Sequence, residues 1–256
     1  MQPEPSDLVR SVSRAFRVLE VVGASRAPLT VKAIARRCQL NLSTTYHLVR
    51  TLTYEGYLVR GSDGCYVLGA SVALRFHDLQ TSLRQPPEVH AVLRNLAAVT
   101  RRTAYLGRFV NGRIVITDLV EGPESPYLED LEVGLDVAAH ATVIGKVLLA
   151  ALPKARCAEY LAAQGMRRFT PRTPVDTEEL EAELAGVCAG RPVLEHGQFR
   201  EGVSCVGVLV ARDTEWLAVV ASTRADEVPG ELTRHTLRAA EDLVATSPRG
   251  EGHPYV

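Results

Sequence analysis

A run of polar side chains between positions 43 and 60 contains the first residues in this sequence that could recognise another molecule. They carry hydroxyl, phenol, imidazole and guanidinium groups: Ser43, Thr44, Tyr46, His47, Arg50 and Arg60. In a helix with Thr45 and Val49 turned inward, the first five lie on the opposite face. A strip of donors suits base edges and phosphate oxygens, whereas an ordinary solvated helix carries a Glu/Lys mixture. The strip therefore indicates contact with a nucleic-acid groove.

A second candidate site lies at the start of an apolar helix, residues 142–151, in the C-terminal half. The first amides of a helix have no partner within it, and together with the helix dipole they attract an anion. We therefore expect the amides of Thr142, Val143 and Ile144 to face outward towards an anionic ligand. Gly145, one turn in, removes side-chain bulk, so that either a ligand or a neighbouring strand can come close.

The remaining reactive side chains do not form a pattern that predicts catalysis. The cysteines are scattered without a Cys-x-x-Cys pair or a histidine at metal spacing: Cys38, Cys65, Cys157, Cys188 and Cys205. Cys205 with His140 or His196 could in principle form a nucleophile and base, but their spacing does not require it. The sequence also has no glycine-rich phosphate loop and no Gly-x-Ser-x-Gly motif. We expect no catalytic site, metal or cofactor.

Composition and charge restrict the class of protein. With 46% apolar and 23% charged residues in 256, the chain has a globular composition. It has neither a secretory signal at its start nor an apolar run of the roughly 20 residues that a bilayer helix needs, so we expect a cytoplasmic protein that does not span a membrane. Residues 1–60 contain nine Lys/Arg and four Asp/Glu, against 29 and 30 in the whole chain. The N-terminal part is thus +5 and the remainder −6, which favours either a polyanion partner for the first part or a solvated basic face.

Apolar residues at helical spacing predict three short helices before position 57. Their inward positions are Val12, Phe16, Leu19 and Val22, then Val31, Ile34 and Ala35, and then Thr45, Leu48, Val49 and Leu52. The expected hydroxyl caps at the three starts are Ser11 or Ser13, Thr30 and Ser43. Two β-prone runs, 57–60 and 65–68, flank a glycine-bounded turn and predict a hairpin with Arg60 at its base, within reach of a phosphate. Together these elements make a winged helix-turn-helix.

The rest of the chain predicts an antiparallel sheet flanked by helices. A loosely helical apolar pattern over residues 70–83 predicts a linker helix, and a further helix is expected to begin at Pro87. Asn111-Gly112 joins two β-prone runs, 103–110 and 113–120, and is a strong hairpin signal. Later strands are expected at 192–196, 204–212 and 216–222, with a closing helix over 229–245. We therefore predict an α+β fold with a DNA-binding domain at 9–69, a linker helix at 70–85 and a second domain at 86–247.

Several segments, in order and spacing, resemble the IclR family of transcription regulators. In the N-terminal part these are SVSRAFRVL at 11–19, LNLSTTYHLVRTL at 40–52, and EGYL at 55–58 with YVLG at 66–69; in the C-terminal part they are AHATVIGKVLLA at 139–150 and REGVSCVGV at 200–208. The likeness covers about residues 9–246. It implies a C-terminal GAF-like domain that binds a small, often carboxylate-bearing, effector.

The resemblance also implies roles for particular residues. It places Cys205 in the effector pocket, whereas a buried thiol that acts only as a small hydrophobe is the alternative. The sequence itself adds that Ser222, at the end of the adjacent strand, could donate a hydrogen bond to the ligand or merely cap a turn. Glu195 and His196 could modulate the charge of a ligand, but we expect them at a solvated strand end. The linker helix pairs subunits in the family, so Phe76 and Leu79 would either contact a second copy or pack within one chain.

The sequence therefore favours a regulator that binds an operator in double-stranded DNA as a homodimer or homotetramer and responds to a small-molecule effector. Effector binding would shift the relative positions of the DNA-binding domains. A thiol-based redox-responsive regulator is an alternative, which requires an exposed Cys205 with a depressed pKa. A GAF-like-domain enzyme is also compatible with these residues. So is a non-specific nucleic-acid binder, although that function would leave the acidic C-terminal domain without a role.

Overall fold

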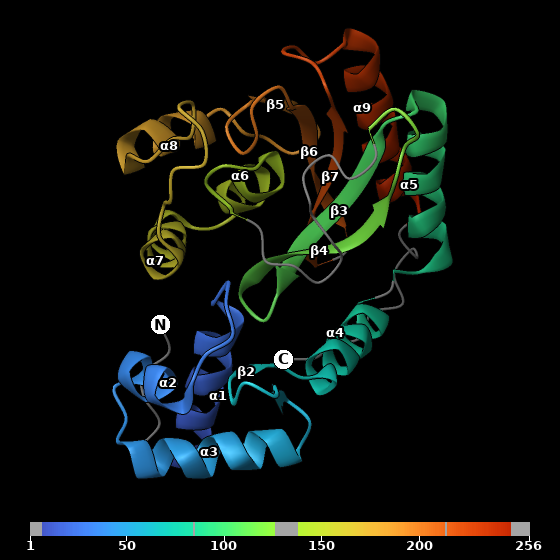
Figure 1. Cartoon of the computed structure of the whole chain (residues 1–256). Coiled ribbons are helices and arrows are strands. Elements are labelled where there is room, and N and C mark those ends of the chain that lie inside the picture. The colour runs from blue at the N-terminus through green and yellow to red at the C-terminus, as the bar shows by residue number, and fades with distance from the viewer. Residues whose placement is uncertain (1–6, 84, 126–137, 213, 247–256) are drawn as a thin grey trace. The chain divides into compact units, whose positions relative to one another are not determined.

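The computed structural model describes residues 7–83, 85–125, 138–212 and 214–246. They belong to two compact units, residues 1–81 and 82–256 (Figure 1). Within the ranges expected for the linker helix and the second domain, residues 84, 126–137, 213 and 247 lie outside the described residues. None of the helices in the described ranges is long and apolar enough to cross a bilayer.

The first unit is a three-helix cluster followed by a two-stranded hairpin and a further helix. Its elements are α1 (Arg10–Gly23), α2 (Val31–Cys38), α3 (Leu42–Tyr54), β1 (Leu58–Arg60), β2 (Tyr66–Leu68) and α4 (Ala70–Ser82). The core between the helices and the hairpin includes Val18, Ile34, Val49 and Leu58, each at most 1% exposed. The helix-turn-helix and its hairpin are therefore present as the sequence predicts.

Two local expectations for this unit are wrong. The first helix begins after Val9 without a side-chain cap, and it buries Val18 and Val22 while Val12 and Phe16 are 50% and 60% exposed. Of the four positions expected to face inward, Val22 is buried and Leu19 packs against the core, whereas Val12 and Phe16 lie outside the contact of α1 with α2 and α3. The third helix begins two residues earlier than expected, so its cap is Asn41 and not Ser43. Thr30 does cap α2, because its hydroxyl accepts a hydrogen bond from the Ala33 amide at 3.2 Å.

The second unit contains a five-stranded antiparallel sheet with the strand order β4-β3-β7-β6-β5. The strands are β3 (Thr103–Val110), β4 (Arg113–Val120), β5 (Pro192–His196), β6 (Ser204–Arg212) and β7 (Glu215–Thr223). The helices are α5 (Pro87–Thr100), α6 (Val143–Ala150), α7 (Lys154–Gln164), α8 (Thr177–Leu184) and α9 (Gly230–Ala245). The turn between β3 and β4 has positive φ at Asn111 and Gly112, 51° and 76°, as the dipeptide predicts.

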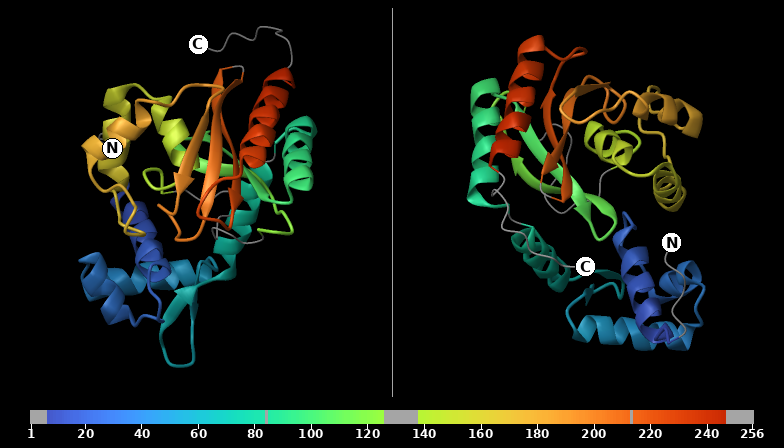
Figure 2. Two further views of the ribbon diagram at one scale, coloured as in Figure 1. Left: turned by 90° about the horizontal axis from the view of Figure 1, so that it is seen from above. Right: turned by 180° about the vertical axis from the view of Figure 1, so that it is seen from behind.

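Helices cover the two faces of this sheet differently. Helices α5 and α9 lie side by side on one face, and α6 lies on the other with α7 and α8 beyond it (Figures 1 and 2). The helix α6 comes unusually close to the sheet because two strand glycines lie under it. A Cβ atom on Gly207 would be 2.8 Å from Val143 Cγ2, and one on Gly107 would overlap Ile144 Cγ2. The start of α6 is thus held against the centre of the sheet.

Candidate nucleic-acid interface and buried ligand site

Helix α3 presents the polar strip on its exposed side. Ser43, Tyr46, His47 and Arg50 are exposed and Thr44 is half-buried, while Thr45, Val49 and Leu52 on the opposite side are at most 7% exposed. A fold that buried Ser43, Tyr46 or Arg50 would have ruled out a role in groove contacts. Instead, these side chains are free of the protein's own core and available to a partner.

The turn before α3 fixes where this strip begins. Gln39 adopts the left-handed conformation with φ 56°, and the Leu40 amide donates to Ala35 O at 2.9 Å, which ends α2. Asn41 Oδ1 then accepts a hydrogen bond from the Thr44 amide at 2.7 Å. The Thr45 hydroxyl donates back to Asn41 O at 2.9 Å, so both faces of the first turn are anchored. Ser43 therefore does not cap the helix, and its hydroxyl is exposed at the start of the strip.

The hairpin places Arg60 at the end of β1, where the residue is exposed and pairs with Tyr66 in register. The turn that follows is closed by Asp63 Oδ1, which accepts a hydrogen bond from the Cys65 amide at 3.0 Å. This bond lowers the pKa of Asp63. Backbone hydrogen bonds between Tyr66 and Leu29 at 2.8 and 3.0 Å tie the hairpin to the segment before α2. The hairpin is therefore held in place within the unit that also contains α3.

The start of α6 differs in two respects from the expected anion site. The Thr142 amide is not free, because it donates to Ala138 O at 3.0 Å, and the Thr142 hydroxyl accepts from the Gly145 amide at 3.2 Å. Gly145 makes room for the chain itself, since a Cβ atom there would overlap the Ala139 backbone. The preceding turn therefore occupies the space that a ligand was expected to use. Val143 and Ile144 are 2% and 1% exposed and pack onto the strand glycines.

A row of polar side chains crosses the sheet beside this helix. Strand register aligns Glu195 with Cys205, Cys205 with Ser222, and Ser222 with Thr103. Side chains of directly paired residues point to the same face of a sheet. This is the α6 face, because Cys205 belongs to the apolar cluster that contains Val143 and Ile144. We call these four residues the polar row; each is at most 2% exposed.

Two of the sequence-predicted ligand residues are in direct contact within the polar row. Cys205 Sγ lies 3.2 Å from Ser222 Oγ. Glu195, which we expected at a solvated strand end, is instead 2% exposed, and its carboxylate accepts a hydrogen bond from the Gln198 amide. Alternation along β5 alone could not reveal this, because the burial of Glu195 follows from its pairing with Cys205. The row therefore offers hydroxyl, thiol and carboxyl groups on an otherwise apolar face.

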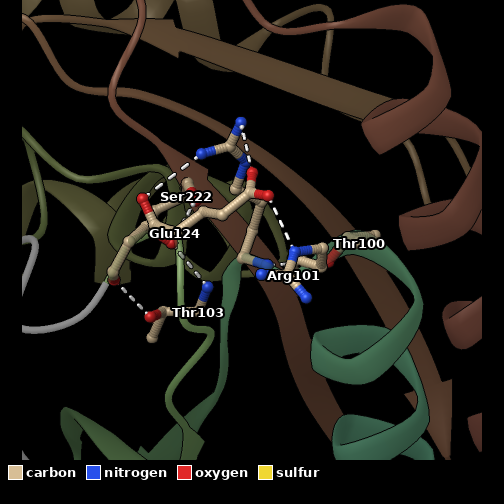
Figure 3. Close-up of polar contacts among 7 residues, drawn as sticks. Thr100, Arg101, Thr103, Glu124 and Ser222 are labelled. Carbon is tan, nitrogen blue, oxygen red and sulfur yellow. Dashed lines mark hydrogen bonds and ion pairs between the residues drawn. The ribbon is translucent and has the colours of Figure 1, made fainter.

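The chain segment that leads up to residue 125 is fixed at the Ser222 end of the row (Figure 3). The Ser125 hydroxyl donates to Ser222 O at 3.2 Å and accepts from the Thr103 amide at 2.8 Å. Glu124 Oε1 accepts from Arg101 Nε at 2.7 Å, and the Arg101 guanidinium lowers the pKa of that carboxyl. These contacts place the end of β7, the start of β3 and residue 125 together.

The histidines that an enzyme would use with Cys205 are engaged by other groups. His140 Nε2 bonds Arg167 O at 2.8 Å, and burial lowers the pKa of His140. His196 Nδ1 lies 3.1 Å from Ser204 Oγ. Cys205 itself is only 1% exposed, so the exposed thiol that the redox interpretation requires is not present. Within the described ranges, no group of three or more His, Cys, Asp or Glu side chains could hold a metal ion.

Two family models match the chain and together cover most of it. Residues 11–62 match the IclR helix-turn-helix domain, and residues 83–243 match the C-terminal domain of the bacterial transcriptional regulator IclR. The chain is 28% identical over 214 residues to the HTH-type transcriptional regulator XynR of Escherichia coli. This alignment covers 79% of this chain and 81% of XynR. It is also 30% identical over 202 residues to the probable transcriptional regulator SauR of Cupriavidus necator, and that alignment covers 78% of this chain and 79% of SauR.

A solved structure of similar fold contains a bound ligand. It is an IclR homolog from Microbacterium hydrocarbonoxydans complexed with 4-hydroxybenzoate, with a TM-score of 0.66. The two chains are 22% identical, and the match covers 92% of this chain and 100% of that one. At this identity the likeness shows that the two chains share a fold.

Proposed function

Because this chain belongs to the IclR family of bacterial transcriptional regulators, we propose that it binds a specific operator through α3 and releases or engages that operator when a carboxylate-bearing small molecule binds in its second unit. It acts in the cytoplasm as a homo-oligomer. Two copies present two α3 helices to half-sites about one helical turn, ~34 Å, apart.

The observation that carries the DNA-binding part is the exposure of Ser43, Tyr46, His47 and Arg50 on a helix whose opposite side is core. In the proposed complex α3 lies in the major groove. Its side chains Ser43, Tyr46, His47 and Arg50 then reach base edges, and Arg60 on the hairpin reaches a phosphate. Thr44, half-buried at the first turn, lies where a phosphate approaches the helix N-terminus.

The polar row supports the second part of the proposal. Ser222 and Cys205 place a hydroxyl and a thiol 3.2 Å apart on an apolar face, and Val143 and Ile144, at the positive end of the α6 dipole, belong to the same cluster as Cys205. Glu195 at the far end of the row would accept a hydrogen bond from a ligand hydroxyl. A ligand with a carboxylate at one end and a hydroxyl at the other matches both ends, and the 4-hydroxybenzoate bound by the homolog of similar fold has this chemistry.

The test of DNA binding starts from the DNA that is recovered and sequenced with the purified protein. Its affinity for the wild-type chain and for Arg50→Ala is then measured by fluorescence anisotropy. Loss of a base-contacting arginine costs about 1–3 kcal/mol, so we expect operator binding to weaken roughly 5- to 150-fold. Arg75→Ala is the matched control, because Arg75 is an exposed arginine on α4 that pairs with Asp78 at 2.8 Å. Equal affinities for the two variants would refute the proposed role of α3.

The test of the effector site uses a bulky substitution in the polar row. Small aromatic and aliphatic carboxylates are first screened for their effect on operator binding by the wild-type chain. Cys205→Trp should abolish the response to any active compound and leave operator affinity in its absence within about twofold, whereas Cys188→Trp, at an exposed thiol, should respond normally. Ser222→Ala is the milder second variant and should weaken the response. If Cys205→Trp still responded, the effector would bind elsewhere.

A further inference from the structure

A cavity lies at the edge of the sheet, outside the polar row. It has a volume of about 530 Å³, which is within the usual range for small-molecule sites. Helices α6 and α8, the edge strand β5 and the segments next to them line it: Lys146, Arg172, Glu183, Val187, Val193, Leu194, His196 and Gln198. The polar row and the operator-binding proposal do not use Lys146 or Arg172.

The unusual feature of this cavity is a lysine that is buried in the wall. Lys146, on α6, is 2% exposed, and its ammonium group forms an ion pair with Glu183 and a hydrogen bond with Gln198 Oε1. The Glu183 side chain, in contrast, is 35% exposed. Among the described residues these two are the only partners of the ammonium group, which has three N–H donors. The buried positive charge is therefore balanced by one carboxylate that is itself partly in water.

A second cation faces the same cavity. Arg172 is exposed, and its guanidinium contacts His196 O at 3.5 Å, which uses one of its five donors. Arg172 also borders a separate cavity of about 340 Å³, which the acidic residues Glu201 and Asp226 line as well. Those two charges disfavour an anion there, whereas on the Lys146 side two cations face one carboxylate.

We propose that the cavity between α6, α8 and β5 binds a small carboxylate whose charged group lies between Lys146 and Arg172 and whose apolar part packs against Val187, Val193 and Leu194. The site is separate from the polar row but connected to it, because Gln198 contacts both. The side-chain oxygen of Gln198 accepts a hydrogen bond from the Lys146 ammonium group, and the backbone amide of Gln198 donates one to the Glu195 carboxylate. A carboxylate that draws the Lys146 ammonium from Gln198 changes the contacts next to Glu195, and it thereby modulates the effector response.

The decisive variant removes the competing carboxylate. In Glu183→Gln the Lys146 ammonium keeps a hydrogen-bond partner but loses its counter-charge, so an external carboxylate should bind on the order of tenfold tighter, or more, than to the wild-type chain. The probes are butyrate and succinate, with butyramide as the uncharged analogue, at constant ionic strength in calorimetric titrations and thermal melts. Glu179→Gln is the matched control, since Glu179 is an exposed glutamate on the same helix.

We expect the carboxylates to raise the melting temperature of Glu183→Gln by more than that of Glu179→Gln, and we expect butyramide to have no such effect. Equal effects in the two variants, or an equal effect of butyramide, would overturn the proposal. If Glu183→Gln did not fold, carboxylate binding to the wild-type chain would be compared with binding to Arg172→Gln, which should fold because Arg172 is exposed. Binding to Arg172→Gln that is at least fivefold weaker supports the site, and unchanged binding rejects it. Binding should persist in Cys205→Trp, and its loss there would place the carboxylate in the polar row instead.

Discussion

The contact between Gly207 and Val143 is one of the close contacts that hold α6 against the sheet beside the candidate ligand site, and it makes a quantitative prediction. A methyl group on Gly207 would lie 2.8 Å from Val143 Cγ2 and 3.2 Å from Val220 Cγ2, against an ordinary separation of about 3.5–4.0 Å. Gly207→Ala should therefore push α6 away from the sheet. Overpacking of this kind lowers the free energy of unfolding by about 1–3 kcal/mol.

A double-mutant cycle separates this clash from a general loss of stability. Val143→Ala alone removes two buried methyl groups, each worth roughly 0.8 kcal/mol, and leaves a cavity, for a total cost of about 2 kcal/mol. In the double variant the new methyl group occupies the space that Val143 vacates. We therefore expect a cost well below the sum of the two single changes, with a coupling of about 1–2 kcal/mol.

The chain offers a specific reporter for this experiment. Trp216 is its one tryptophan and lies on β7, so intrinsic fluorescence during denaturant titration follows the second unit. Gly230→Ala is the control, because a Cβ atom there would meet nothing within 4 Å. A Gly207→Ala variant as stable as Gly230→Ala, or a double variant as unstable as the sum of its parts, would refute the packing argument.

Two further predictions concern the first unit and the pH dependence of the second. Asn41→Ala removes the cap on the Thr44 amide and should lower the free energy of unfolding by about 0.5–2 kcal/mol, as measured by thermal melts followed by circular dichroism. Ser43→Ala should change this free energy by no more than about 0.5 kcal/mol and still weaken operator binding. Equal melting temperatures of the two variants would contradict the assignment of the cap. Burial lowers the pKa of His140, so the folded chain binds this proton less readily than the unfolded chain, and the free energy of unfolding should fall as pH drops below the ordinary value of about 6.5. His140→Gln should lose less stability than the wild-type chain between about pH 7.5 and about pH 5.5 in the fluorescence assay, and identical pH profiles would argue against a buried neutral imidazole.

Elements set by local chemistry could be predicted from the sequence. The Asn111-Gly112 turn needs two positive φ values that few other dipeptides adopt easily, so both flanking strands were predicted with their observed bounds. The exposed strip on α3 could also be predicted, because helical geometry alone separates it from Thr45 and Val49. These features depend on residues that are close in the chain.

Features that depend on strand pairing, or on packing beyond a single helix or strand, could not be predicted. Glu195 is buried because β5 pairs with β6, and neither the strand itself nor its exposed neighbour Leu194 indicates this. Gly145 is required by the approach of the Ala139 backbone, which in sequence cannot be distinguished from room for a ligand. The buried charge of Lys146 was likewise hidden, because its partner Glu183 lies on another helix. Register and tertiary contacts decided each of these positions.

The central claim is that α3 contacts DNA bases with its exposed face, and photo-crosslinking tests it most directly. Benzoylphenylalanine replaces Tyr46, which is 56% exposed on α3, and in a control chain it replaces Trp216, which is 39% exposed in the second unit. With the recovered operator, we predict crosslinks from position 46 that map to bases within each half-site, and none from position 216. A chain that binds the operator but does not crosslink from position 46, or crosslinks equally from both positions, would contradict the account.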